Sequence, residues 1–275
     1  MKLGDALYEA GYLANPALTD ILTVGVGLSR PLLLEGPSGV GKTALADALA
    51  TALGRPLHRL QCYEGIDASQ ALYDWNYARQ LVDLAERRGE DPCRREYLLP
   101  RPLLAALMER SGAVLLVDEV DRADEGFEAM LLEVLGENQV TVPEYGTVRA
   151  AGPVQAILTS NRTRPLSDAL RRRCLYHRIE WPSPDEETRI VRLHLPQAET
   201  DLVAAAVRVA DTLRHLDLVK PPGIGETLDL VRGALALHIP VLSASALRRL
   251  LGTIIKDARD WELVEPRVDE LLEGG

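Results

Sequence analysis

One octapeptide limits what this chain can fold into more than any other feature: Gly36-Pro37-Ser38-Gly39-Val40-Gly41-Lys42-Thr43. An apolar run (PLLLE, 31–35) precedes it and a helical pattern over 42–53 follows it. Its glycines let backbone N–H groups converge on a phosphate, and a helix N-terminus there adds positive charge. In this context the spacing is that of a nucleotide phosphate-binding loop. We therefore expect residues 36–44, including Ala44, to bind ATP, with Lys42 on the β and γ phosphates and the Thr43 hydroxyl on Mg²⁺.

Composition places the chain among ordinary globular proteins. Of its 275 residues, 47% are hydrophobic and 26% are charged, which argues against disorder and low complexity. No apolar run reaches the ~18 residues of a membrane span, and residues 1–10 lack a signal-peptide core, so we expect a cytoplasmic protein. A net charge of −10 disfavours nucleic acid as the default partner. Cys62, Cys93 and Cys174 lack metal-ligand spacing and are expected to be buried thiols.

Short apolar runs alternate with helical patterns over the first 180 residues. This alternation predicts an α/β fold, a parallel sheet flanked by helices. The expected strands are 31–35, 56–61, 113–117, 154–160 and 174–180.

Two segments interrupt this alternation. Residues 62–77 form an insert rich in aromatic side chains, and residues 138–150 alternate, turn and alternate again, as a β-hairpin does. Tyr63, Tyr73, Trp75 and Tyr77 could face the pore of a ring or a client protein, but for Trp75 and Tyr77 we favour burial in a small core beneath the insert.

Beyond residue 183 the pattern becomes helical throughout. We expect a nucleotide-binding core over 1–183 and a small all-α domain over 184–275, with Ser183 and Ser243 as helix N-caps. The expected helices are 185–195, 200–216, 226–238, 243–257 and 259–272.

Two carboxylates follow the expected strand at 113–117. Asp118 and Glu119 come at the end of an apolar run, where acidic side chains are costly unless they meet cations. Beside a phosphate loop, Asp118 would hold Mg²⁺ and Glu119 would polarise the attacking water. Asp121 and Asp124 are expected to be capping or surface charges.

Polar residues also follow the strand at 154–160. Asn161 is placed to sense the γ-phosphate and orient the water. Ten residues later come Arg171, Arg172 and Arg173. An arginine triplet is usually a solvated face, but in an oligomer one of these could act as an arginine finger on a neighbouring subunit's nucleotide.

The order of these motifs resembles that of AAA+ ATPases. The insert and the hairpin resemble the two insertions of the MoxR branch, and LLEGPSGVGKT, LLVDEVDRA and LTSNRTRPLSDALRRRC read as MoxR-like. RLQCYEGIDASQALYDWNYARQL is similar to the subset encoded with carbon monoxide dehydrogenase maturation genes. The resemblance covers about residues 18–240.

This resemblance implies a ring, usually a hexamer, that hydrolyses ATP between subunits and remodels other proteins. It also implies a partner with a von Willebrand A domain and a metalloenzyme client. By position, Lys42 and Thr43 would bind phosphates and Mg²⁺, and Asp118 and Glu119 would be the acidic pair. Asn161 would be the sensor and Arg173, then Arg172, the finger.

The chain departs from the family at one place. Where a lid-helix arginine is often found, residues 221–227 read PPGIGET, so Lys220 or Arg232 would have to substitute.

Four other functions remain open from the residues alone. A nucleic-acid motor or loader would show ATPase activity stimulated by DNA or RNA. A small-molecule kinase would release a phosphorylated product. A GTPase would need an Asn-Lys-x-Asp motif, which this sequence lacks. A scaffold would bind nucleotide without turnover.

Overall fold

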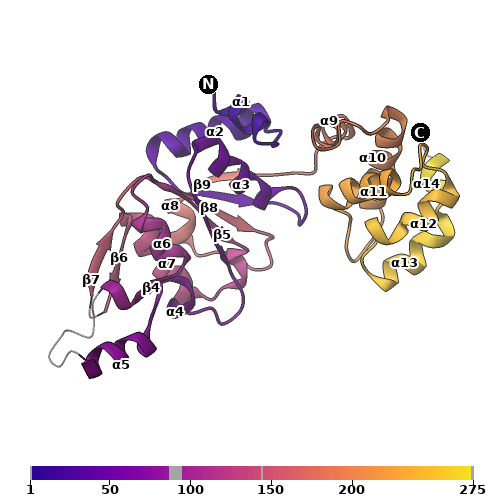
Figure 1. Ribbon diagram of the computed structural model, residues 1–275. Helices are drawn as coiled ribbons and strands as arrows, with labels where there is room; N and C mark the ends of the chain where they lie inside the picture. Colours follow the sequence, from indigo (N-terminus) through magenta and orange to yellow (C-terminus); the bar gives the residue numbers. More distant parts are fainter. Residues whose placement is uncertain (1, 87–94, 144, 274–275) are drawn as a thin grey trace. The chain divides into compact units, whose positions relative to one another are not determined.

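The computed structural model describes residues 2–86, 95–143 and 145–273, so Cys93 lies outside the described residues. The chain divides into two compact units: Met1–Gly36 with Lys42–Ile179, and Pro37–Gly41 with Glu180–Gly275 (Figure 1). Over the described residues, none of the helices combines the length and the apolar character that crossing a membrane requires.

A parallel sheet organises the first unit, as the sequence predicts. Its strand order is β2-β5-β8-β1-β9 and every neighbouring pair is parallel. The five strands are β1 (Leu32–Glu35), β2 (Leu57–Gln61), β5 (Ala113–Asp118), β8 (Val154–Ser160) and β9 (Leu175–Arg178).

Helices cover both faces of this sheet, whose central strands are mostly apolar and buried along their whole length. All residues of β5 and β8 are buried. On one face Leu34 and Leu116 pack with apolar side chains of a first set of three helices. On the other face Leu33 and Leu115 pack with apolar side chains of a second set. The first set is α1 (Leu3–Glu9), α2 (Pro16–Leu28) and α3 (Lys42–Leu53). The second set is α6 (Pro102–Met108), α7 (Glu125–Glu137) and α8 (Asp168–Arg173).

The strand register brings polar residues to one edge of the sheet. Glu35 at the end of β1 lies opposite Ser160 at the end of β8. Gln61 at the end of β2 lies opposite Asp118 at the end of β5. Because the strands are parallel, their carboxyl ends meet at this edge, where ligands bind in open α/β sheets.

The insert and the hairpin form two small antiparallel sheets. β3 (Tyr73–Trp75) pairs with β4 (Leu98–Pro100), and β6 (Gln139–Val142) pairs with β7 (Gly146–Arg149), which confirms the predicted hairpin. The rings of Tyr73 and Trp75 meet edge-on at 6.2 Å. Both are partly buried and pack against the core of the first unit, so Trp75 is packed as expected but not fully buried.

The same expectation is wrong for Tyr77. It is the first residue of α5 (Tyr77–Glu86) and its side chain is 63% exposed. Tyr63 is also exposed. The other short elements of this region are α4 (Ala68–Ala71), η1 (Arg95–Tyr97) and η2 (Val120–Arg122).

The second unit is helical, with its own apolar core. Ser183 and Ser243 cap the helices that follow them, as predicted. The prediction of a single helix over 259–272 is wrong, because the chain there forms two short helices separated by a 3₁₀ turn. Pro266 lies in that turn, and a proline inside a helix lacks the N–H that the next turn needs. The elements are α9 (Pro184–His194), α10 (Thr200–Arg214), α11 (Ile224–Ala236), α12 (Ala244–Ile254), α13 (Ala258–Val264), η3 (Glu265–Arg267) and α14 (Glu270–Glu273).

Candidate active site

The Lys42 side chain turns back over the start of α3. Its Nζ donates to the carbonyl oxygen of Gly36 and to Oδ1 of Asn161, both at 2.8 Å. Burial lowers the pKa of Lys42, and the nearby carboxylates of Asp118, Asp121 and Glu119 oppose that shift by favouring the charged form. A buried cation is thus held at the carboxyl end of the sheet.

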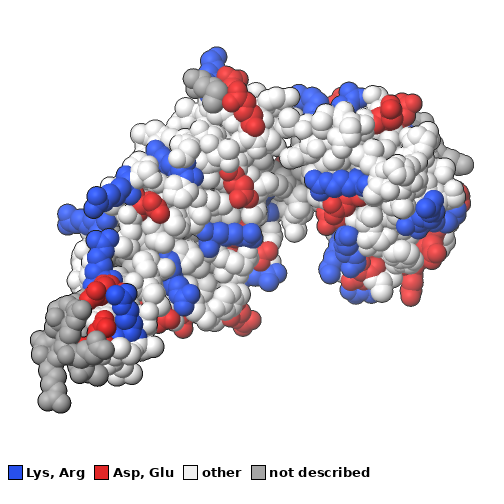
Figure 2. Space-filling view, in the orientation of Figure 1, with Lys and Arg blue, Asp and Glu red and all other residues white. Residues whose placement is uncertain are grey.

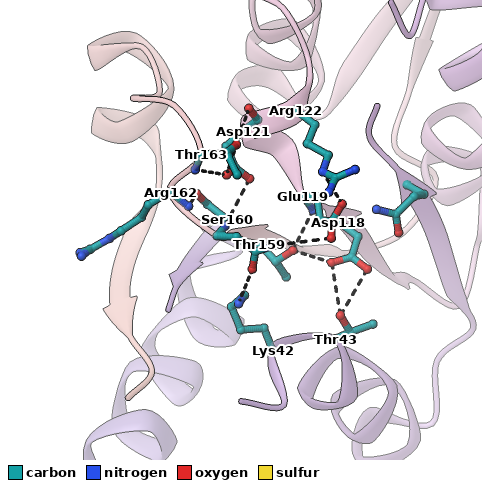
Figure 3. Close-up of polar contacts among 12 residues, drawn as sticks. Lys42, Thr43, Asp118, Glu119, Asp121, Arg122, Thr159, Ser160, Arg162 and Thr163 are labelled. Atoms are coloured by element: carbon teal, nitrogen blue, oxygen red, sulfur yellow. Dashed lines mark hydrogen bonds and ion pairs between the residues drawn. The ribbon is translucent and has the colours of Figure 1, made fainter. Parts of the chain in front are cut away.

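Asp118 ends β5 with its carboxylate buried, and Figure 3 shows its contacts with Thr43 and Thr159. Oδ1 accepts from the Thr159 hydroxyl at 2.5 Å, and Oδ2 accepts from Nη2 of Arg59 at 2.6 Å. The Thr43 hydroxyl, one residue after Lys42, lies 3.2 Å and 3.3 Å from the two oxygens. The structure therefore brings the two expected Mg²⁺ ligands into contact.

Glu119 turns the chain sharply after β5. Its φ of +54° is in the left-handed region, and its N–H donates to the Thr159 hydroxyl at 2.9 Å. Its carboxylate pairs with Nε of Arg122 at 2.9 Å and accepts from Nδ2 of Asn161 at 3.4 Å. Glu119 and Asn161, predicted separately, therefore share a contact.

Asp121 holds the backbone of Asn161 in place. The expectation that Asp121 is a capping or surface charge is therefore wrong. Asp121 is buried and so not a surface charge. It accepts from the N–H of Asn161 at 3.3 Å, and from the N–H and the hydroxyl of Thr163, both at 2.7 Å. Asp124, by contrast, caps α7 as expected.

A second polar group fixes the end of β1, next to the phosphate loop. Glu35 is buried, and its Oε2 accepts from Nε of Arg162 and from the Tyr176 hydroxyl, both at 3.0 Å. Arg162 follows Asn161 and has a φ of +63°. The carboxylate of Glu35 thus ties the residue after Asn161 to the strand before Gly36.

The phosphate loop follows β1 directly. Gly36 N–H donates to the Ser160 carbonyl at 3.3 Å, so the loop leaves β1 beside β8. Gly39 and Gly41 have φ values of +82° and +93°, which side chains rarely adopt. The remaining residues expected to bind ATP differ in exposure: Pro37, Ser38 and Ala44 are exposed and Val40 is buried.

The arginine triplet lies at the end of α8, where all three side chains are exposed. Nη2 of Arg30 donates to the carbonyl oxygens of Arg172 and Arg173 at 3.2 Å and 3.1 Å. These bonds fix the backbone of the two candidate fingers. Their role towards a neighbouring subunit stays a prediction.

The two lid residues considered as substitutes for the family's arginine have other contacts. Arg232 pairs with Asp229 of its own helix at 3.2 Å. The N–H of Lys220 donates to the buried carboxylate of Asp260 at 2.9 Å. Neither contact decides the substitution, which remains a prediction.

Sequence reasoning missed four members of the site: Arg59, Asp121, Arg122 and Thr159. Thr159 and Arg122 lie within the motifs that were recognised, so their proximity to the acidic pair was a usable signal. Asp121 and Arg59 also lie within recognised motifs, but nothing local shows that Asp121 faces residues 161–163 or that Arg59 reaches Asp118 from the neighbouring strand.

The family of the chain follows from comparison with known proteins. Residues 31–174, slightly more than half of the chain, match the model of the AAA domain, dynein-related subfamily. The chain belongs to this family. It is an AAA+ ATPase of the MoxR type, and it binds and hydrolyses ATP. AAA+ proteins typically form oligomers.

Relatives of similar length support the same assignment. Protein NorQ of Paracoccus denitrificans is 26% identical over 247 residues, spanning 87% of this chain and 81% of NorQ. An uncharacterised protein of Staphylococcus haemolyticus is 24% identical over 251 residues, spanning 88% of this chain and 90% of that protein. The Thermotoga maritima RuvB Holliday junction branch migration motor superposes with a TM-score of 0.54 at 15% identity, over 95% of this chain and 78% of RuvB, a likeness of fold alone.

Proposed function

We propose that this AAA+ ATPase uses ATP hydrolysis at the Lys42–Asp118 cluster to remodel a protein client, acting as a chaperone within a ring, most simply a hexamer. One observation carries the proposal. Side chains from the start of α3, from β5 and from the end of β8 converge at one sheet edge, with Lys42 2.8 Å from Asn161 and Thr43 3.2 Å from Asp118. This is the arrangement that ATP hydrolysis needs: cation, metal ligands and water-orienting groups together.

The residues present fit Mg²⁺-ATP. Thr43 and Asp118 offer a hydroxyl and a carboxylate in mutual contact, and Mg²⁺ prefers oxygen ligands and keeps several waters. Within the described part of the chain no group of three or more His, Cys, Asp or Glu side chains could hold a metal, so a site of few protein ligands is the one supported. Bound Mg²⁺ would neutralise charge developing on the phosphates.

Each remaining residue then has a separate task. Lys42 binds the terminal phosphates, Glu119 accepts a proton from the attacking water, and Asn161 orients that water. Glu119 is suited to this task because its left-handed backbone and its contact with Asn161 bring the two side chains together.

Loss of the cluster tests the site. Lys42→Ala should abolish nucleotide binding, and Glu119→Gln should retain binding but lose hydrolysis by about 10²-fold or more. Glu64→Gln, which removes an exposed carboxylate of the insert, is the matched control for Glu119→Gln. Wild-type turnover by either site variant would refute the assigned role.

Completion of the site by a neighbour is the reason for proposing a ring. Arg172 and Arg173 are exposed, and their backbone is braced by Arg30. An arginine supplied in trans contributes about 10³–10⁵ in rate in other phosphoryl-transfer enzymes. Mixing Arg173→Ala with Lys42→Ala subunits should restore activity only where the two meet, and sedimentation should give the ring size.

The client proposed is a metalloenzyme, reached through a partner with a von Willebrand A domain. The similarity of residues 59–81 to the carbon monoxide dehydrogenase subset supports this. Capture experiments with Glu119→Gln, which should hold ATP and client together, would identify both proteins. Capture that Lys42→Ala reproduces equally would contradict an ATP-dependent client.

A nucleic-acid motor is the alternative function, and an ATPase assay with added DNA or RNA distinguishes it from protein remodelling. On the face drawn in Figure 2, basic and acidic side chains both occur on each unit, and the net charge is −10. Proteins that track nucleic-acid backbones present basic surfaces. Strong ATPase stimulation by DNA or RNA at physiological salt would overturn the remodelling proposal.

A further inference from the structure

Asp118 poses a physical problem before any metal arrives. Its side chain is only 6% exposed, and an ionised carboxylate out of water is costly unless a cation or several donors compensate it. Two hydroxyls, those of Thr43 and Thr159, supply neutral donors. The closest positive group is the guanidinium of Arg59, 2.6 Å from Oδ2.

Arg59 reaches this carboxylate from the neighbouring strand. It lies on β2, two residues before Gln61, whose register partner is Asp118. Its Nη2 also donates to Oε1 of Gln61 at 3.0 Å, so Gln61 holds the guanidinium against Asp118. The Arg59 side chain is itself 53% exposed, which leaves it free to move into solvent when displaced.

The two oxygens of Asp118 are not equivalent in this arrangement. Oδ1 is engaged by Thr159, whose hydroxyl also accepts from the Glu119 N–H and is therefore fixed. Oδ2 is engaged by the half-exposed Arg59, and the Thr43 hydroxyl lies at similar distances from both oxygens, 3.2 Å from Oδ2 and 3.3 Å from Oδ1. A metal bound by Thr43 and Asp118 would compete with Arg59 for Oδ2.

We propose that Arg59 is a positioning residue that occupies Oδ2 of Asp118 in the metal-free protein and must be displaced when Mg²⁺ binds. The proposal rests on the metal-binding role assigned to Asp118. Arg59 thereby pairs with the buried carboxylate and orients it, and it sets the Mg²⁺ concentration at which the site fills.

Direct binding of Mn²⁺, a spectroscopic substitute for Mg²⁺, tests this without hydrolysis. Mn²⁺ is titrated into the full chain with saturating ADP, and free Mn²⁺ is followed by electron paramagnetic resonance. Arg59→Gln should bind Mn²⁺ about tenfold more tightly, as expected for removal of one charge-assisted hydrogen bond on a half-exposed side chain. Arg101→Gln removes the same charge from a 48%-exposed arginine that pairs with the exposed Asp74, and should leave binding unchanged.

Two further variants separate the failure modes. Asp118→Asn should lose Mn²⁺ binding; if it binds normally, the metal role of Asp118 fails and the proposal falls with it. If Asp118→Asn loses binding while Arg59→Gln binds as wild type or more weakly, only the competition is refuted. Gln61→Ala, which frees the guanidinium without removing its charge, should tighten binding by about two- to threefold; unchanged binding overturns the proposal, even if Arg59→Gln does not fold.

Discussion

Asp121 offers a sharp test of how the site is held together, because its role comes from the structure alone. Asp121 is 2% exposed, and its carboxylate accepts three hydrogen bonds. Two come from Thr163 at 2.7 Å and one comes from the N–H of Asn161 at 3.3 Å. Asp121→Ala leaves the part-buried N–H groups of Asn161 and Thr163 without this acceptor. With hydrogen bonds to charged groups worth about 1.5–3 kcal/mol each, the two short ones predict a loss of about 3 kcal/mol in unfolding free energy.

Asp124→Ala is the matched control, three residues away. Asp124 is exposed and makes one capping bond to the Phe127 N–H at 2.8 Å, so its loss should cost about 1 kcal/mol. Urea unfolding measures both, with hydrogen exchange of peptides from β5 and β8 reporting on the first unit separately. Equal costs for the two variants would refute the claim that Asp121 is a structural anchor.

Asp121→Ala should also alter catalysis, by lowering the turnover number more than the affinity for ATP. Loss of Asp121 frees the backbone of Asn161, and small displacements of orienting groups reduce rates by up to about 10²-fold. Lys42 keeps its bond to Gly36, so ATP affinity should change by less than about threefold. A fall in affinity with an unchanged turnover number would contradict the assigned function of Asn161.

Two further predictions concern other parts of the chain. The side chain of Arg214 is 4% exposed, makes a bidentate pair with the buried Glu187 and stacks 4.4 Å over the ring of Trp181. Arg214→Ala should therefore lower the unfolding free energy of the helical unit by about 3–5 kcal/mol, measured in urea. The control Arg232→Ala removes an exposed pair and should lower it by less than about 1 kcal/mol. Burial raises the pKa of Cys62 and of Cys174 to about 12, with nearby carboxylates adding to the shift at Cys62. Against an ordinary value of 9.0, the thiolate fraction at pH 8 falls by about a thousandfold, so in a Cys93→Ser background iodoacetamide should label neither residue until urea is added, and rapid native labelling of either would contradict that burial.

The parts of the fold that the sequence predicts are those decided by local pattern. The run at 113–117 is short and apolar at every position, as is typical of a strand buried on both faces, and β5 is that strand. Lys42–Leu53 begins at the phosphate loop and ends before Gly54, and the helix has those bounds. Lys42, Thr43, Asp118 and Glu119 could be named because each lies directly at a strand end or helix start.

The parts that escaped prediction depend on contacts between distant segments. Asp121 follows a strand among other acidic residues, a position that usually faces water; it is buried because residues 161–163 bring three donors to it. Arg59 lies on a strand of mixed polarity, and nothing local shows that its neighbour is β5. Tyr77 was assigned to a core because aromatic residues usually bury area, but the insert leaves it exposed.

The contrast between Lys42 and Arg59 explains why exchange would occur at Asp118. Lys42 is buried and tied to both Gly36 and Asn161, so moving it would break two bonds and expose their acceptors. Arg59 is half exposed, and its second contact is to the exposed Gln61, so its release costs little more than one ion pair. A site that must hold a buried carboxylate and later admit a metal needs one cation that stays and one that leaves. A planar guanidinium suits the second task, because it can bond to a carboxylate and an amide at once and regain its hydration when it is displaced.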